Sequence, residues 1–147
     1  DSPGIASASA DNRLDFVQIA TTGNAVDFGN YVTVRQQRTS ACSPTRGVLV
    51  RGGNPAQTNA MEFFTISTLG DGADFGDATS KCKGGGGCPD PTRLVMKLGG
   101  GDGSGQTTNI INYVQISTTG NAIDFGDSVL QTYSVNRGSC STGHGGL

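Results

Sequence analysis

The residues best placed to do chemistry are three aspartates that follow one another closely. Asp71, Asp74 and Asp77 stand at intervals of three residues, with a glycine in each interval. Calcium takes about six to eight oxygen ligands, so these carboxylates and the carbonyls of glycine-rich turns could hold that ion. The alternative, which we favour, is that the aspartates accept backbone hydrogen bonds in a turn. We expect the same of Asp27 and Asp124, which recur at the position of Asp74.

No set of side chains has the spacing of a catalytic site. His144, the only histidine, follows Cys140 by four residues, and a thiol–imidazole pair needs an orienting third group and a formed pocket. Glu62, the only glutamate, lies at a strand start, where we expect it to be solvated. The glycine-rich segments 84–87 and 99–105 lack the ending of a phosphate-binding loop and are expected to be exposed loops. We therefore predict that the chain is not an enzyme.

The four cysteines point to an oxidising, extracellular setting, because an even number is typical of secreted chains with few other stabilising features. Four of the five residues between Cys82 and Cys88 are glycines, and we expect this flexible loop to close as a disulfide. Cys42 and Cys140 would then pair across a closure seam or between chains. A single close cysteine pair and one histidine do not match the spacing of zinc ligands.

Composition favours strands and turns over helices. Helix-favouring residues are scarce, with one glutamate, three lysines and two methionines against 24 glycines in 147 residues. The formal net charge of −2 at pH 7 disfavours nucleic acid as a partner, because neutralising phosphates requires a basic surface. The sequence has no apolar run of about 18 residues, so we expect no insertion into a membrane. We expect no cofactor, and calcium at Asp71, Asp74 and Asp77 is the alternative.

An internal repeat organises the whole chain, which we interpret as a single repeat domain over residues 1–147. Its three cores share an alternating segment, a Gly-Asn or Gly-Asp pair and the triplet Asp-Phe-Gly: 15–30, 62–77 and 112–127. They start 47 and 50 residues apart (62 − 15 and 112 − 62). A second block, with Pro-Thr-Arg, an apolar run and Gly-Gly, recurs at 42–53 and 88–100, and partial copies lie at 2–9 and 140–147.

Each repeat contains three or four short strand signals and no 3.6-residue apolar period, so we predict an all-β fold. Alternation predicts strands at 16–19 and 31–39. An apolar run before Gly52-Gly53 predicts a third strand at 48–50, and a fourth lies at 25–28. Repeats of this size are typical of β-propeller blades.

The order of an Arg-Gly pair, an apolar run, Gly-Gly and an alternating strand resembles the kelch repeat. In that family an aromatic residue packs between blades, a role that the resemblance gives to Phe28, Phe75 and Phe125. The pattern Thr-Gly-Asn-Ala-x-Asp-Phe-Gly-Asp, with Ser-Pro-Thr-Arg-Gly and Gly-Gly, is similar to tandem kelch-like repeats of structural and fibre proteins from marine bacteriophages and algal viruses. This resemblance implies propeller-type blades and a place on a virion.

Three repeats of about 47–50 residues are fewer than the roughly four to eight blades of a closed propeller. Unpaired edges favour self-association, so we expect copies to complete one another as a closed ring or as a filament, unless the chain is a piece of a longer propeller. Arg46 and Arg93 recur before the apolar strand. We expect them to bond carbonyls or Asp27 and Asp74 of an adjacent blade, the alternative being a central channel that binds an anion.

These observations lead us to expect a structural or adhesive protein that assembles with itself, as a virion appendage or as the subunit of an extracellular filament. The alternative is a carbohydrate-binding propeller module that recognises a receptor glycan through its loops. The absence of tryptophan and the presence of only three tyrosines count against that alternative, because sugar faces stack on aromatic rings. A glycan-active enzyme is the third possibility, and no catalytic pair supports it.

Overall fold

The computed structural model describes residues 11–34, 38–50, 52–53, 57–100 and 107–132. These residues form ten strands and no helix, so the all-β prediction is confirmed for the described part of the chain. None of its segments is a helix long and apolar enough to cross a membrane. The partial repeats expected at 2–9 and 140–147 lie outside the described residues.

Two four-stranded antiparallel sheets make up most of the molecule, and both run through their strands in sequence order. The first sheet contains β3 (Thr39–Cys42), β4 (Arg46–Val50), β5 (Thr58–Thr65) and β6 (Ala73–Cys82). The second contains β7 (Gly85–Pro89), β8 (Arg93–Leu98), β9 (Thr108–Gln115) and β10 (Ile123–Thr132). We call them the middle sheet and the last sheet.

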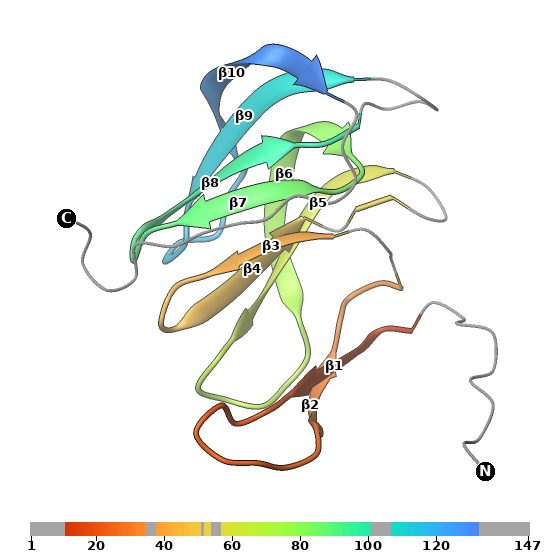
Figure 1. Ribbon diagram of the computed structural model, residues 1–147, viewed down its shortest axis with the longest axis vertical. Helices are drawn as coiled ribbons and strands as arrows, with labels where there is room; N and C mark the ends of the chain where they lie inside the picture. Colours follow the sequence, from red (N-terminus) through yellow and green to blue (C-terminus); the bar gives the residue numbers. More distant parts are fainter. Residues whose placement is uncertain (1–10, 35–37, 51, 54–56, 101–106, 133–147) are drawn as a thin grey trace.

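A two-stranded hairpin of β1 (Arg13–Phe16) and β2 (Val26–Asn30) precedes them and is called the first hairpin. It corresponds to the last two strands of each sheet in chain order, because the three repeat cores form β1–β2, β5–β6 and β9–β10. Figure 1 shows the first hairpin at one end of the stack and the last sheet at the other. The sheets form an open stack, and the described residues do not close into a ring.

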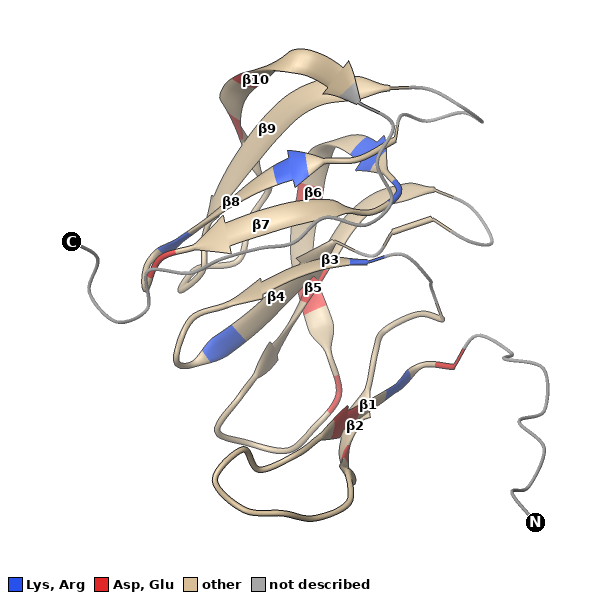
Figure 2. Ribbon diagram, viewed as in Figure 1, with Lys and Arg blue, Asp and Glu red and all other residues tan. Residues whose placement is uncertain are grey.

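The core lies between the middle and last sheets, where the apolar runs of both repeats meet. Its buried members include Val48, Val50, Met61, Phe75, Cys82, Leu94, Met96, Leu98, Val114 and Ile116. Charged residues are few and are spread along the stack instead of gathering into one patch (Figure 2). Stability therefore rests on apolar burial between sheets.

The Pro-Thr-Arg block forms the turn between the first two strands of each sheet. In the last sheet Asp90 Oδ1 accepts bonds from the backbone N–H groups of Thr92 (2.6 Å) and Arg93 (2.7 Å). These bonds hold the pKa of Asp90 below its usual range. In the middle sheet Ser43 Oγ accepts from Arg46 N at 3.1 Å. A side-chain acceptor followed by proline is typical of a type I turn.

Two strand predictions were wrong in their limits. β1 ends at Phe16, so Val17 and Ile19 lie beyond the strand, and within the segment 31–39 only Thr39 is in a strand among the described residues. The strand predicted at 48–50 is confirmed within β4. The fourth strand, predicted at 25–28, is present as β2 and begins at Val26.

The glycine-rich segment 84–87 was expected to be an exposed loop, and this prediction was wrong. Gly85, Gly86 and Gly87 belong to β7 and pair with Leu98, Lys97 and Met96. A Cβ at Gly87 would lie 2.9 Å from the Leu94 side chain. The glycines therefore allow β7 to pack closely against its neighbours, an effect that composition alone does not reveal.

Candidate functional site

The surface that joins successive sheets is built twice from the same repeat positions. The carbonyls of Asp-Phe-Gly-Asn/Asp in one repeat accept backbone N–H bonds from the Gly-x-Gly/Ala segment of the next. The bonds run from Gly70 N to Phe28 O (2.8 Å), Gly72 N to Asn30 O (2.7 Å), Gly120 N to Phe75 O (2.7 Å) and Ala122 N to Asp77 O (2.8 Å). Matching pairs at both junctions show that the repeat specifies how one sheet meets the next.

Side-chain acceptors complete each junction. Asp71 Oδ1 accepts from Asn30 N at 2.8 Å, and at the next junction Asn121 Oδ1 accepts from Asp77 N at 3.0 Å. A second pair lies deeper: Val32 N donates to Glu62 Oε2 (2.8 Å), and Thr79 N donates to Asn112 Oδ1 (2.9 Å). The first hairpin carries Asp15 and Asn24 at the repeat positions of these acceptors.

Glu62 was expected to be solvated, and this prediction was wrong. The side chains of Glu62 and Asn112 are both 0% exposed. The partner that makes burial possible, the N–H of Val32, comes from another repeat 30 residues away. A buried polar group is tolerated when it is hydrogen-bonded, so these two residues have a structural role in the junctions.

The phenylalanine of Asp-Phe-Gly is buried wherever another sheet follows it in the stack. Phe28 and Phe75 are 8% and 2% exposed, whereas Phe125 in the last sheet is 55% exposed. Phe75 meets Phe63 edge to face, with ring centroids 6.0 Å apart, and Phe125 meets Tyr113 in the same way at 6.1 Å. The inter-sheet role expected of these residues therefore applies to Phe28 and Phe75. Phe125 has the same local contact but no sheet over it among the described residues.

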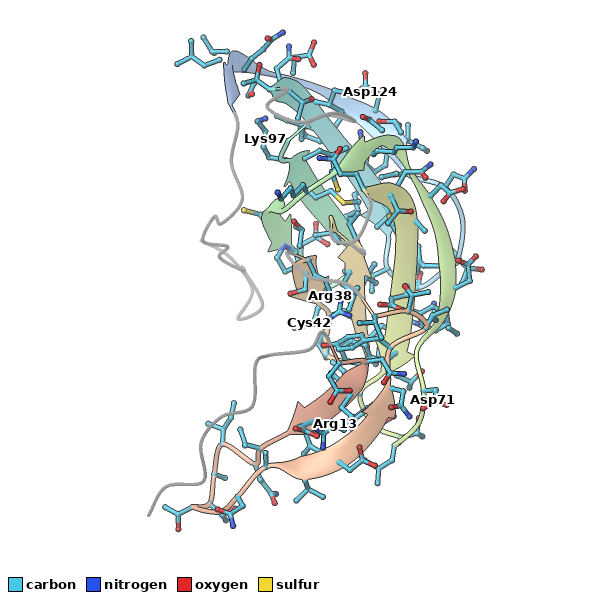
Figure 3. All side chains as sticks on the ribbon, turned by 90° about the vertical axis from the view of Figure 1, so that its right-hand side faces the viewer. Arg13, Arg38, Cys42, Asp71, Lys97 and Asp124 are labelled. Atoms are coloured by element: carbon cyan, nitrogen blue, oxygen red, sulfur yellow. The ribbon has the colours of Figure 1, made fainter. Side chains whose placement is uncertain are left out.

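Further apolar side chains are exposed on β10. Val129 and Leu130 are 101% and 71% exposed. Figure 3 places Asp124, of the same strand, near one end of the stack and Asp71 near the other end. We call the outer surface of β8, β9 and β10 the open face.

The first hairpin exposes the opposite half of the junction. Ile19 is 99% exposed, although Ile116 at the same repeat position is 1% exposed in the core. Val17 is 60% exposed and its counterpart Val114 is 3% exposed. The end of the stack formed by segment 15–25 therefore displays side chains that the last sheet buries against the middle sheet.

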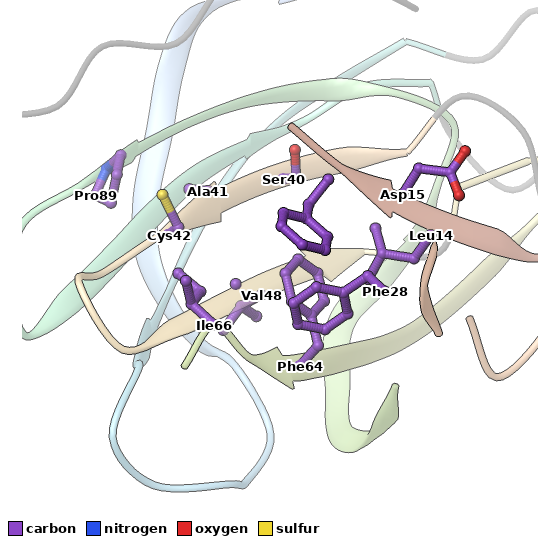
Figure 4. A pocket seen from close by; sticks show the side chains of 12 residues that line it. Leu14, Asp15, Phe28, Ser40, Ala41, Cys42, Val48, Phe64, Ile66 and Pro89 are labelled. Carbon is purple, nitrogen blue, oxygen red and sulfur yellow. The ribbon is translucent and has the colours of Figure 1, made fainter. Parts of the chain in front are cut away.

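A cavity of about 540 Å³ lies between the first hairpin and the middle sheet. Phe16, Phe28 and Phe64 line it together with the outward side of β3 and β4 (Figure 4). The two-stranded hairpin leaves the first two strands of the four-stranded sheet uncovered, and the cavity occupies that space. Its lining is mainly apolar, and Asp15 directs its carboxylate away from the rings (Figure 4).

Arg46 connects the middle sheet to the turn that follows β9. Its Nη1 donates to the carbonyls of Ile116 (3.2 Å) and Ser117 (3.0 Å), and its guanidinium lies over the Phe63 ring at 4.6 Å. Carbonyls of an adjacent repeat are one of the two partner types expected for this arginine. Arg93 lies over Tyr113 at 5.8 Å on the open face.

The aspartates proposed as calcium ligands do not gather into a group of three that could hold a metal ion in the described part of the chain. Asp71 serves the junction by accepting from Asn30, and Asp124 accepts from the backbone N–H of Gly126 at 3.3 Å. Asp74 and Asp77 lie on β6. In the β5–β6 ladder they pair with Glu62 and Ala60, on either side of a register shift.

The structure does not form the disulfide expected between Cys82 and Cys88. Cys82 is a free thiol at the end of β6, and burial raises its pKa to about 12. The intervening glycines form a strand instead of a flexible loop, which holds Cys88 opposite Val95 on an exposed surface. Cys42 is exposed beside the cavity. Cys140 and His144 lie outside the described residues, so a bond from Cys42 to Cys140 stays a prediction.

The sequence analysis singled out the repeated aspartates, arginines and phenylalanines, but it did not recognise the two repeat positions that supply the acceptors of the junctions. Asp15, Glu62 and Asn112 occupy one repeat position, and Asn24, Asp71 and Asn121 occupy another. Aligning the repeats and asking which positions always carry an acceptor oxygen would have identified both sets. No protein-family model matches the chain, and no curated protein matches it.

Proposed function

We propose that this chain is a structural protein that assembles with itself, the subunit of a virion appendage or of an extracellular filament. The observation that carries the proposal is the exposure of two surfaces that the repeat buries elsewhere. Phe125 is 55% exposed on the open face although Phe75 is 2% exposed, and Ile19 is 99% exposed although Ile116 is 1% exposed. Contiguous exposed apolar surface marks an interaction site.

On this proposal each four-stranded sheet is a propeller-type blade of kelch-like order, and the first hairpin is an incomplete one. Four-stranded antiparallel sheets that follow the chain, each joined to the next by the same contacts, support this interpretation. The function is geometric: the chain contributes blades to an assembly and requires no catalytic group.

Carbohydrate binding is the competing function, and its site would be the cavity beneath the first hairpin. Three phenylalanines line that cavity, and aromatic rings are the usual platforms for sugars. However, Phe28 meets both Phe16 and Phe64 edge to face, with centroids 6.1 and 5.6 Å apart. The rings therefore cover one another, and the structural function has the stronger support.

Negative-stain electron microscopy of the purified chain over a range of concentrations tests the structural function. We expect fibres of uniform width whose length grows with concentration. Compact rings would show that the chain forms a closed assembly and not a filament. Particles of single-chain size at every concentration, together with specific retention on a glycan array, would overturn the structural function in favour of carbohydrate binding.

A further inference from the structure

We infer that copies of this chain join head to tail through the contact that already joins its own sheets. Segment 15–25 of one copy would dock on the open face of another, in the register that segments 62–72 and 112–122 occupy within the chain. This inference deepens the proposed function and rests on it. The occupant of the open face is thus a second copy, identified by hydrogen-bonding groups that match one for one.

The backbone groups needed for such a junction are present at both ends. At the internal junctions the residues equivalent to Phe125 and Asp127 accept through their carbonyls from Gly70 and Gly72, and again from Gly120 and Ala122. In the first repeat the residues at the donor positions are Gly23 and Ala25. Their N–H groups would take the same two bonds to a neighbouring copy.

The side-chain acceptors match in the same way. Asn24 stands where Asp71 and Asn121 accept backbone N–H bonds, so it would accept from Asp127 of the neighbouring copy. Asp15 stands where Glu62 and Asn112 accept, and would accept from Val129. Asp15 and Asn24 are both exposed in the chain.

The apolar and cationic parts of the junction also have counterparts. Ile19 would take the place of Ile116, which is 1% exposed in the core. Arg93 would donate to the carbonyls of Ile19 and Ala20, as Arg46 donates to those of Ile116 and Ser117.

Gly126 gives an independent indication of the docked copy. Gly29 and Gly76 have φ values of 150° and 134°, and at either position a Cβ would overlap the carbonyl of the next repeat, that of Gly70 or of Gly120. Gly126 has the same conformation, with φ of 133°, but a Cβ there would meet nothing within 4 Å. The space beside Gly126 is where the carbonyl of Gly23 from a second copy would lie.

The contact joins two different surfaces, so it leaves one free surface of each kind on every pair of copies. Such a heterologous contact produces rings when the rotation closes and open helical polymers when it does not. A dimer joined through a single isologous interface is not compatible with it, because the same patch would then have to face itself, whereas a ring of two copies would contain the contact twice.

Sedimentation velocity of matched variants of the full chain tests the contact. Gly126→Ala places a methyl group in the docking space, and Gly120→Ala is its control, because φ there is 155° and a Cβ also meets nothing within 4 Å. Ile19→Asp places a charge at the other surface. Its control is Val26→Asp, since Val26 is 55% exposed and its equivalent Ile123 is 56% exposed.

We expect Gly126→Ala and Ile19→Asp each to raise the dissociation constant at least about tenfold, while both controls associate like the unmodified chain. An equimolar mixture of Gly126→Ala and Ile19→Asp should form dimers, because one intact surface of each kind remains in the pair. Rings that depend on Gly126 and Ile19 would support this contact and overturn the filament. Association that ignores both substitutions would overturn the contact alone, and a chain that never associates would overturn both.

Discussion

Replacing Phe75 measures how much the internal junction contributes to folding. Its side chain is 2% exposed between the middle and last sheets and packs edge to face on Phe63. Removing a buried phenylalanine typically costs about 3–5 kcal/mol, as lost apolar burial plus the cavity that remains. We expect Phe75→Ala to lower the free energy of unfolding by that amount, measured by urea denaturation at a concentration where the chain is monomeric.

Phe125→Ala is the matched control, because this residue has the same repeat position and an equivalent ring contact but is 55% exposed. No buried cavity forms there, so we expect a loss of about 1 kcal/mol or less, most of it from the contact with Tyr113. Phe75→Leu keeps much of the apolar volume and should lie between the two, which keeps the comparison valid if the alanine variant does not fold. Equal losses for Phe75→Ala and Phe125→Ala would refute the claim that Phe75 holds the two sheets together.

Two further predictions concern buried polar groups. Asn112→Ala removes the acceptor of Thr79 N and leaves that N–H unsatisfied, so urea denaturation should show that the free energy of unfolding falls by about 1–3 kcal/mol. The control Gln115→Ala, at an exposed position of the same strand, should change it very little. Similar losses for the two variants would contradict the structural role of Asn112. Burial raises the pKa of Cys82 from 9.0 to about 12, so the folded state holds the thiol proton more tightly than the unfolded state. The contribution of this protonated thiol to folding stability is complete below about pH 9 and is lost as the pH rises toward 12. Ellman's reagent at pH 8 should therefore label the exposed Cys42 and Cys88 at once and Cys82 only on unfolding. Rapid labelling of Cys82 in the folded chain would refute its burial.

The repeat predicted much of the fold because each of its signals is local. Alternating residues, Gly-Gly after an apolar run and Pro-Thr-Arg before it are all readable along the chain, and they led to an all-β interpretation with the short strand at 48–50. The glycines of β7 were misread, because glycine is typical of turns and strands rarely contain three in succession. The requirement for glycine there comes from neighbours such as Leu94 and Lys97, which are close in space and not in sequence.

The candidate site was predicted less well, because its partners come from different repeats. Glu62 was expected to be solvated because it was placed at a strand start, whereas its hydrogen-bond donor, Val32 N, belongs to the preceding repeat. Arg46 was correctly singled out because an arginine recurs at its position, but the Ile116 and Ser117 carbonyls lie 70 and 71 residues away. Interactions across a stack of repeats become visible only when the register between repeats is known.

The composition of the repeat positions argues that the outer surfaces obey the rules of the inner junctions. Asp15, Glu62 and Asn112 differ in length and charge, and what they share is an oxygen that can accept an N–H. Glu62 and Asn112 use that oxygen within the chain. Asp15 has the acceptor in a repeat that has no preceding sheet among the described residues.

Gly126 extends this argument to the other end of the stack. A φ of 133° is costly for any residue except glycine, and at Gly76 the same conformation makes room for the carbonyl of Gly120. Nothing in the described part of the chain requires that room at Gly126. On the proposed head-to-tail contact, the acceptor at Asp15 and the space beside Gly126 are the two halves of one junction, and a second copy would supply both the missing donor and the missing carbonyl.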